Sequence, residues 1–170
     1  YGRGMTEWHY QWIDRHFEKN GWQVEFIDGR RRYDCFNQEK GLVIEIQKVA
    51  LYDYIIEKSN HVIEKGLTIN WIFHMEIFRS FKMHDNCFQA NTFRRLVILD
   101  IIEKYKGSDS VNFYVDSLAH THLGKSSKGL LKLLPNPNTG HYAYYTVHYA
   151  PLQAEYNNSS KRDAVTGAPS

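Results

Sequence analysis

The sequence predicts an α/β protein in which helices pack on a mixed sheet. Two observations predict this class. Three short strand patterns follow one another closely enough to form hairpins, and a helical pattern then separates them from a fourth, apolar strand. Hairpins pair their strands antiparallel, whereas a helical crossover favours parallel pairing, so the sheet should contain both kinds. The expected element order over the first 74 residues is α-β-β-β-α-β.

The individual elements follow from periodicity and from capping residues. Thr6 suits a helix N-cap, Asn20-Gly21 and Gly66 suit helix ends, and Asp28-Gly29 suits a hairpin turn. The predicted bounds in this part are 7–19 (helix), 23–27, 31–37 and 42–47 (strands), 51–65 (helix) and 68–74 (strand).

The later part of the chain has weaker patterns. Thr92 precedes a run over 93–107 that is helical by spacing, although its Ile and Val content also suits a strand. A strand is expected at 111–116, a short helix or strand at 128–134, and a strand at 141–149. We therefore predict a core over 5–106, an α+β C-terminal extension over 107–155 packed on that core, and a disordered tail over 156–170.

Composition limits the functional classes. The 170 residues are 42% hydrophobic and 15% aromatic, which is typical of a globular protein. A net charge of +2 neither requires nor excludes a nucleic-acid partner. Two cysteines cannot build a disulfide framework, and no apolar run approaches the roughly 20 residues that span a bilayer. These features predict a cytoplasmic location and no membrane partner. The chain is expected to be a homodimer or a piece of a larger parent protein.

The most informative stretch is 33–48, which reads YDCFNQEKGLVIEIQK. Its second strand is nearly all apolar, and an acid inside such a strand needs a compensating partner. If the turn centres on Glu39-Lys40, residues whose numbers sum to 79 are paired, and Asp34 faces Glu45. A three-residue loop with Gly41 in the left-handed region would shift this register by one.

Two carboxylates that face each other across a ladder repel, which indicates a cation between them. Glu45 and Gln47 are two residues apart and therefore share a face of their strand. The alternative is a solvent-facing Asp34 and a Glu45 that is paired with a nearby Lys or Arg.

Four short motifs occur in order along this predicted core. They are TEWHYQW at 6–12, RYD at 32–34, IEIQ at 44–47 and WIF at 71–73. Together they resemble the PD-(D/E)XK nuclease superfamily, in particular its competence protein CoiA-like branch. The resemblance implies a restriction-endonuclease-like αβββαβ core. It also implies a nuclease that uses Mg²⁺ or Mn²⁺ to hydrolyse DNA phosphodiester bonds.

The resemblance also implies a role for each matching residue. Asp34, Glu45 and the carbonyl of Ile46 would bind the metal ion, since hard oxygen ligands suit Mg²⁺ or Mn²⁺. Gln47 would orient the attacking water, and Glu7 would assist from the first helix.

The chain departs from the family pattern at two places. Gln47 stands where many relatives carry Lys, and Ile13-Asp14 stands where the branch often has a Lys. These departures leave open a second function, a non-catalytic nucleic-acid-binding module that retains the fold.

Several residues near the motifs are candidates for contacting the nucleic acid. His9 is expected on the helix surface or in contact with substrate. Arg31 and Arg32 lie beside Asp34 and would contact DNA phosphates or line a solvated hairpin edge. Lys48 follows Gln47 directly, and strand alternation turns it to the other face unless the strand ends there.

A zinc site is a further possibility. His84-x-x-Cys87 has the spacing of half a structural zinc site, and its partners would be distant histidines. The candidate partners are His74, His120, His122 and His141. Such a site would make the chain a zinc-stabilised interaction domain.

Overall fold

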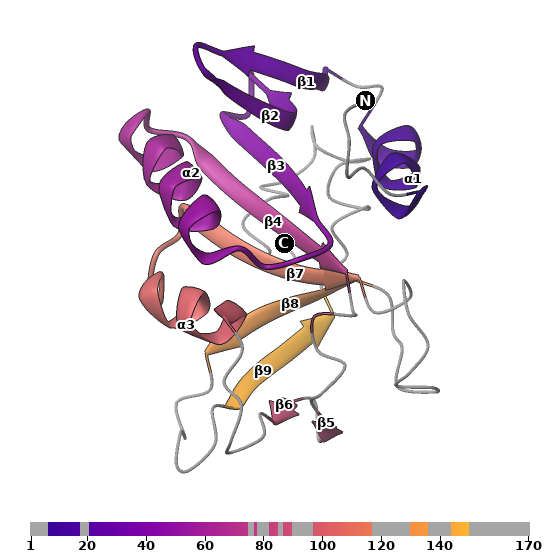
Figure 1. Cartoon of the computed structure of the whole chain (residues 1–170), viewed down its shortest axis with the longest axis vertical. Coiled ribbons are helices and arrows are strands. Elements are labelled where there is room, and N and C mark those ends of the chain that lie inside the picture. Colours follow the sequence, from indigo (N-terminus) through magenta and orange to yellow (C-terminus); the bar gives the residue numbers. More distant parts are fainter. Residues whose placement is uncertain are drawn as a thin grey trace.

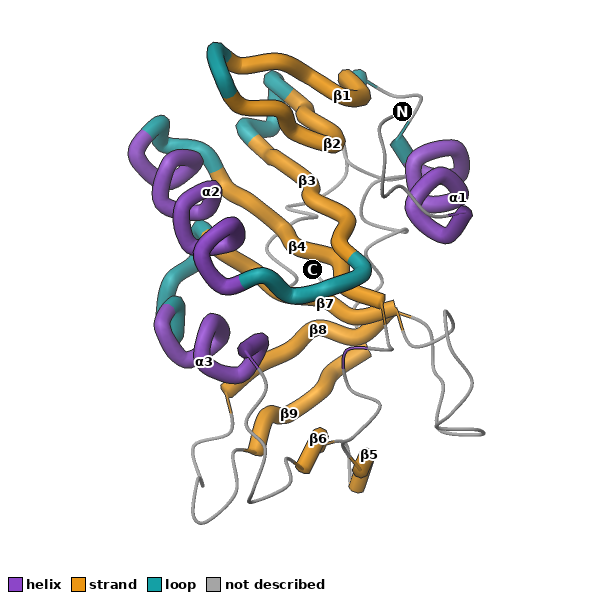
Figure 2. Tube along the Cα trace, in the orientation of Figure 1, coloured by secondary structure: helices purple, strands orange, loops and turns teal. Residues whose placement is uncertain are grey.

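Over the residues that it describes, the computed structural model is an α/β protein with three helices and one mixed sheet (Figures 1 and 2). The structure describes residues 7–17, 21–74, 77, 82–84, 87–89, 97–116, 130–135 and 144–149. Within these residues, none of the helices has both the length and the apolar character needed to cross a bilayer.

The helices and strands have well-defined bounds. The helices are α1 (Glu7–His16), α2 (Tyr52–Glu64) and α3 (Val97–Lys104). The first strands are β1 (Gln23–Asp28), β2 (Arg31–Asn37), β3 (Leu42–Gln47) and β4 (Thr68–His74). The later strands are β5 (Lys82–His84), β6 (Cys87–Gln89), β7 (Val111–Asp116), β8 (Leu130–Pro135) and β9 (Tyr144–Tyr149).

The sheet combines an antiparallel half with a parallel centre. Its strand order is β1-β2-β3-β4-β7-β8, continued by β9-β6-β5. Strands β1, β2 and β3 pair antiparallel, β3-β4 and β4-β7 pair parallel, and the remaining pairs are antiparallel. The expected mixed pairing is confirmed, because α2 provides the crossover that a parallel β3-β4 pair requires.

The two faces of the sheet carry separate apolar clusters. On one face, Val43, Trp71 and Phe113 pack with side chains of α2 and α3. On the other face, Ile44 and Ile72 pack with side chains of α1. Successive residues of a strand point to opposite faces, so α1 lies across the sheet from α2 and α3 (Figure 1).

Most predicted elements are confirmed. Strands 31–37, 42–47, 68–74 and 111–116 have their predicted bounds, 97–104 is helical, and 130–135 is a strand. The first strand is one residue longer than expected, because Asp28 pairs with Arg31 and leaves Gly29 and Arg30 as the turn. The hairpin of β5 and β6 was not predicted. Thr92 and the tail at 156–170 lie outside the described residues.

The register of the β2-β3 hairpin is the one predicted from its turn. Cys35 pairs with Ile44 and Asn37 with Leu42, so paired numbers sum to 79. Gly41 does adopt the left-handed region, with φ of 61°. It does so within a four-residue loop over 38–41, closed by a 3.2 Å hydrogen bond from the Gly41 N–H to the Gln38 carbonyl. The register shift that a three-residue loop would cause does not occur.

The strand β7 lies inside the sheet, next to β4. It belongs to the part of the chain that was expected to form an extension packed on the core. The chain after residue 107 thus contributes a central parallel strand, and the division into core and extension stays a prediction.

Candidate active site

Asp34 and Glu45 are both buried and lie between β2 and β3. The paired residues end at Cys35 and Ile44, one step before Asp34 and Glu45 would face each other. There, each carboxylate accepts an N–H from the opposite strand. The Asp34 N–H donates to Glu45 Oε2 at 2.8 Å, and the Ile46 N–H donates to Asp34 Oδ2 at 2.8 Å. Side chains therefore replace backbone pairing at this point.

Lys58 of α2 reaches the same place from the helix that follows β3. Its Nζ donates to Glu45 Oε1 at 2.9 Å, to the Arg32 carbonyl at 2.7 Å and to the Tyr54 hydroxyl at 2.6 Å. An ammonium group has three donors, so all three are used. Tyr54 in turn donates to Glu45 Oε1 at 3.2 Å. Of the alternative reading, the pairing of Glu45 with a Lys is confirmed, whereas a solvent-facing Asp34 is wrong, since Asp34 is 2% exposed.

Sequence reasoning did not identify Lys58 as part of the site. On α2, Lys58 follows Ile55 by three residues and precedes Val62 by four, so it occupies the buried stripe of the helix. A Lys on a buried stripe needs a partner, and an acid in a buried strand needs one too. Pairing these two irregularities would have linked Lys58 to Glu45.

Burial controls the electrostatics of the pair. Loss of solvent raises the pKa of Glu45 to about 7, with the charge on Asp34 adding to the rise and Lys58 opposing it. The pKa of Asp34 is also raised by burial, against the lowering effects of the Ile46 N–H, Lys58 and Arg32. Both carboxyls therefore bind a proton more readily than exposed carboxyls do.

The raised pKa of Glu45 predicts how stability depends on pH. Between the ordinary pKa of 4.5 and about 7, folded Glu45 holds a proton that the unfolded chain has lost. The free energy of unfolding should therefore fall as pH rises through this window, by on the order of 1–3 kcal/mol. Thermal melts across this range, compared with Glu45→Gln, test the expectation. An equally steep decline in both proteins would assign the effect to other groups.

His9 and Arg32 lie near the second carboxylate oxygen of Asp34, Oδ1. The Nε2 atom of His9 and the Nη2 atom of Arg32 each lie 3.8 Å from Asp34 Oδ1. Burial lowers the pKa of His9, with Glu45 opposing and Arg32 adding to the decrease. The expectation that His9 lies on the helix surface is wrong, because the residue is 6% exposed.

A third carboxylate, Glu25, lies next to this group on β1. In the β1-β2 ladder, Val24 pairs with Cys35 and Phe26 pairs with Tyr33, so Glu25 lies beside Asp34 between these two pairs. Glu25 has a φ of 53°, in the left-handed region, so the backbone is strained there. Its Oε1 accepts a 2.8 Å hydrogen bond from Arg32 Nη1. Arg32 thus bridges Glu25 and Asp34, and its contact with DNA phosphates stays a prediction.

Two tryptophans of α1 anchor this helix to the end of β7. The indole N–H groups of Trp8 and Trp12 both donate to Asp116 Oδ2 at 2.9 Å. Trp8 also contacts His74 edge to face, with ring centroids 5.0 Å apart. These contacts hold α1 over the ends of β4 and β7, so that His9 reaches Asp34.

Replacing Asp116 with Ala should release this anchor. Two indole donors would lose a charged acceptor, which predicts a loss of about 1–3 kcal/mol in the free energy of unfolding. Urea unfolding followed by tryptophan fluorescence measures the change. Asp14→Ala, an exposed acid on the same helix, is the control and should change stability by less than about 0.5 kcal/mol. Equal stability of Asp116→Ala and wild type would contradict the anchoring role.

The remaining predicted site residues lie farther from the buried pair. Glu7 is exposed and sits about 200° around α1 from His9, on the face away from the sheet. Gln47 is half-buried at the end of β3, on the same face as Glu45. Lys48 is exposed just past the strand end, and Arg31 is half-buried at the hairpin turn. Among the described residues, no hydrogen bond connects Glu7 or Gln47 to Asp34 or Glu45.

The carbonyl of Ile46 was predicted as a third metal ligand. The Ile46 N–H donates to Asp34 Oδ2 at 2.8 Å. Within the part of the chain described, no group of three or more His, Cys, Asp and Glu side chains is arranged to hold a metal ion. A metal site here would therefore depend on two carboxylates, with other ligands supplied by the backbone or by water.

The strand order does not bring His74 close to the other two described candidates for zinc ligands, His84 and Cys87. His84 and Cys87 pair with each other across the β5-β6 turn. His74 is in β4, which is separated from β6 by β7, β8 and β9. Four strand spacings amount to roughly 19 Å, too far for shared zinc ligation. His120, His122 and His141 lie outside the described residues.

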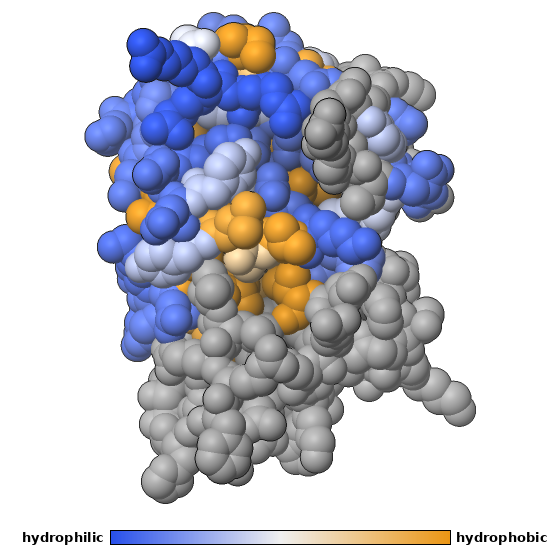
Figure 3. Space-filling view, in the orientation of Figure 1, coloured by the Kyte–Doolittle hydropathy of each residue, from blue (hydrophilic) through white to orange (hydrophobic). Residues whose placement is uncertain are grey.

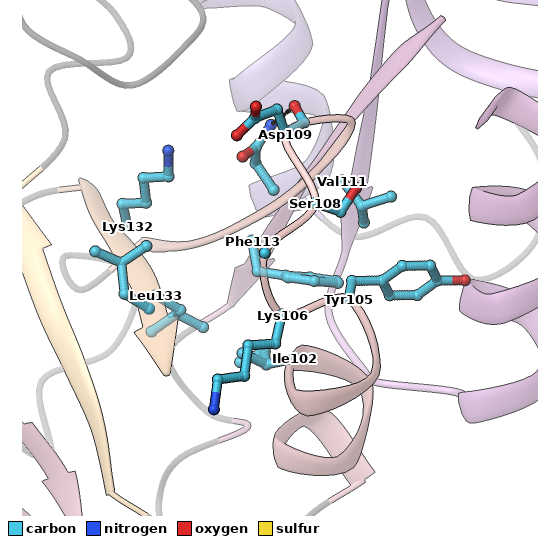
Figure 4. Close-up of a pocket in the computed structure, with 12 residues that line it drawn as sticks. Ile102, Tyr105, Lys106, Ser108, Asp109, Val111, Phe113, Lys132 and Leu133 are labelled. Carbon is cyan, nitrogen blue, oxygen red and sulfur yellow. Dashed lines mark hydrogen bonds between the residues drawn. The ribbon is translucent and has the colours of Figure 1, made fainter. Parts of the chain in front are cut away.

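A pocket of about 190 Å³ lies apart from these carboxylates, at the start of β7 (Figure 4). Tyr105, Lys106 and Ser108 line it from the end of α3 and the turn that follows, and Phe113 and Leu133 line it from the sheet. The candidate site lies instead toward the carboxyl ends of the parallel strands, where Gln47 and His74 are located. The pocket and the buried carboxylates are therefore separate features.

Comparison of the chain with protein-family models, with curated proteins and with solved structures finds no match. The resemblance to the PD-(D/E)XK superfamily thus stays a prediction from the motifs at 6–12, 32–34, 44–47 and 71–73.

Proposed function

We propose that this protein is a metal-dependent nuclease that hydrolyses DNA phosphodiester bonds. The proposal places a restriction-endonuclease-like core of the CoiA-like type in residues 5–106. The supporting observation is the buried pair of Asp34 and Glu45, which approach each other from facing strands: Glu45 accepts the Asp34 N–H, and Asp34 accepts the Ile46 N–H. Burial of two carboxylates whose pKa values are raised, at a point where the strand pairing is interrupted, costs free energy. Residues of this kind are concentrated at functional sites.

The carboxylates have the chemistry that Mg²⁺ or Mn²⁺ would require. Asp34 Oδ1 has nitrogen atoms of His9 and Arg32 3.8 Å away, and its other oxygen accepts the Ile46 N–H. Mg²⁺ commonly binds through one or two carboxylates and keeps several waters, so Asp34 and Glu45 would suffice as side-chain ligands. When bound, the ion would polarise the scissile phosphate and lower the pKa of a coordinated water.

The other residues of the site would prepare the water and balance charge. Gln47 shares a face with Glu45, so its amide would orient the attacking water. Lys58 supplies a cation on the same face, where Gln47 provides none. In many members of the PD-(D/E)XK superfamily, a Lys stands at the position that corresponds to Gln47. We therefore assign to Lys58 the electrostatic role of that Lys. Its three hydrogen bonds hold Glu45 and Tyr54 in place.

A cleavage assay tests this function. The wild-type chain would be incubated with single-stranded, duplex and branched DNA, with Mg²⁺, Mn²⁺ or EDTA. Cleavage of at least one substrate with metal, and none with EDTA, is the expected result. Absence of cleavage from every substrate in both metals would reject the enzyme.

One observation favours the second candidate, a nucleic-acid-binding module without catalysis. Both oxygens of Glu45 already accept hydrogen bonds, from the Asp34 N–H on one side and from Lys58 and Tyr54 on the other. Glu45 is therefore satisfied without a metal ion. Metal-independent DNA binding together with inactivity in the same assay would support this module.

A further inference from the structure

An apolar patch lies on the surface directly after the site. Four residues in the segment from β3 into α2 are large, hydrophobic and exposed: Val49 (55% exposed), Leu51 (54%), Tyr52 (41%) and Tyr54 (38%). The segment crosses the face seen in Figure 2, and Figure 3 shows apolar surface gathered in the same region. Only two other described residues, Ile27 and Ile63, are large hydrophobics with comparable exposure. The patch is therefore concentrated beside the site.

Tyr54 connects this patch to the buried carboxylates. Its hydroxyl bonds Glu45 Oε1 at 3.2 Å and Lys58 Nζ at 2.6 Å, while part of the residue stays exposed. Val49 is only two residues beyond Gln47. A nucleic acid whose scissile phosphate is held near Glu45 must therefore place its neighbouring nucleotides on or near the patch.

A duplex is poorly suited to such a surface. Its bases are stacked inside, so an approaching protein meets phosphates and sugars, and apolar side chains would remove water from phosphates without replacing the lost hydrogen bonds. An unpaired strand differs, since its bases can turn outward and stack on aromatic rings. Lys48, exposed between Gln47 and Val49, adds positive charge at the edge of the patch, which suits the backbone of the same strand.

We propose that the segment 48–54 is a base-stacking platform for single-stranded DNA, which enters the site with one base on Tyr54 beside Glu45 and a further base on Tyr52, about 200° around the start of α2. The inference rests on the proposed nuclease function and specifies its substrate as an unpaired strand. Leu51 and Val49 pack against base and sugar edges, and the Tyr54 ring stacks the nucleotide nearest to Glu45.

Binding measured without cleavage tests the platform. Fluorescence anisotropy in EDTA would compare a labelled thymidine homopolymer with an adenine-thymine duplex of equal length. Wild type should bind the single strand more tightly than the duplex. Tyr52→Ala should weaken single-strand binding by about 5- to 100-fold, from one lost stacking interaction. Tyr52→Phe keeps the ring and should bind within about twofold of wild type.

Ile63→Ser is the matched control, because Ile63 is exposed on the same helix but eleven positions beyond Tyr52. It should leave binding unchanged. Leu51→Ser provides a second variant of the patch and should also weaken single-strand binding. Unchanged binding in both patch variants, or preferential binding of the duplex, would overturn the platform. A concentration-dependent dimer that Leu51→Ser abolishes would assign the patch to self-association and would equally overturn it.

The platform and the nuclease can fail separately. Tyr52-dependent binding of single strands, with no metal-dependent cleavage of any DNA, would retain the platform and reject the nuclease. Asp34-dependent cleavage restricted to duplex DNA would retain the nuclease and reject the platform.

Discussion

Replacing Asp34 with Asn should lower metal-dependent DNA cleavage by about 10³-fold or more while the protein stays folded. In the proposed nuclease the charged oxygen would hold the ion, and the ion would contribute several kcal/mol of transition-state stabilisation. The fold should survive because Asn keeps an oxygen that accepts the Ile46 N–H, now 2.8 Å from Asp34 Oδ2. The same result is expected for Glu45→Gln. Initial cleavage rates at saturating Mn²⁺, together with thermal melts, provide the measurement.

Glu39→Gln is the control for both variants. Glu39 is exposed in the loop of the same hairpin, so its replacement removes the same charge without touching the site. Its cleavage rate should equal that of wild type. Near-wild-type rates for Asp34→Asn or Glu45→Gln in a metal-replete assay would end the assignment of these residues as metal ligands.

Replacing Lys58 with Met should have the largest effect on stability. It leaves Glu45 buried without its cation, and breaking a buried pair typically costs about 3–5 kcal/mol. Cleavage, measured well below the melting temperature, should fall by about 10²–10³-fold if Lys58 supplies the positive charge of the site. Chemical denaturation gives the first quantity and initial rates give the second.

Lys65→Met is the matched control for Lys58→Met. Lys65 follows α2 and pairs with Asp28 in an exposed salt bridge, so its loss should cost about 1 kcal/mol or less. The double variant Glu45→Gln/Lys58→Met should be more stable than Lys58→Met alone, because a neutral amide at position 45 needs no cation. Additive losses in the double variant would show that the two side chains do not stabilise each other.

Local patterns predicted the scaffold of this site well. The β2-β3 register followed from the position of the turn, because one buried face fixes how two strands pair. The buried place of Asp34 opposite Glu45 followed from that register. The helix α2 was recognised from its apolar stripe, although Lys58 interrupts the stripe.

Contacts between distant segments could not be predicted in the same way. Trp8 and Trp12 meet Asp116 across more than a hundred residues, and no period or spacing in the sequence links them. The choice between helix and strand at 97–104 depended on packing against β7 and the rest of the sheet, since Ile and Val suit either element. His9 was expected at the surface, because its burial depends on where α1 docks.

The interrupted ladder at Asp34 has a consequence for motion. On the β3 side, β2 is joined at this position by side chains instead of backbone pairs, and on the β1 side the backbone pairing skips the position of Glu25 and Asp34. Such a point can open without unzipping the β2-β3 pairs from Cys35 to Asn37 or the β1-β2 pairs on either side of it, so the hairpin has a hinge at the site. The amide protons of Asp34 and Ile46 are then local reporters. Relative to the intrinsic exchange rate at each pH, their protection from exchange should fall when the carboxylates are protonated, and the protection of ladder amides such as that of Val43 should fall much less.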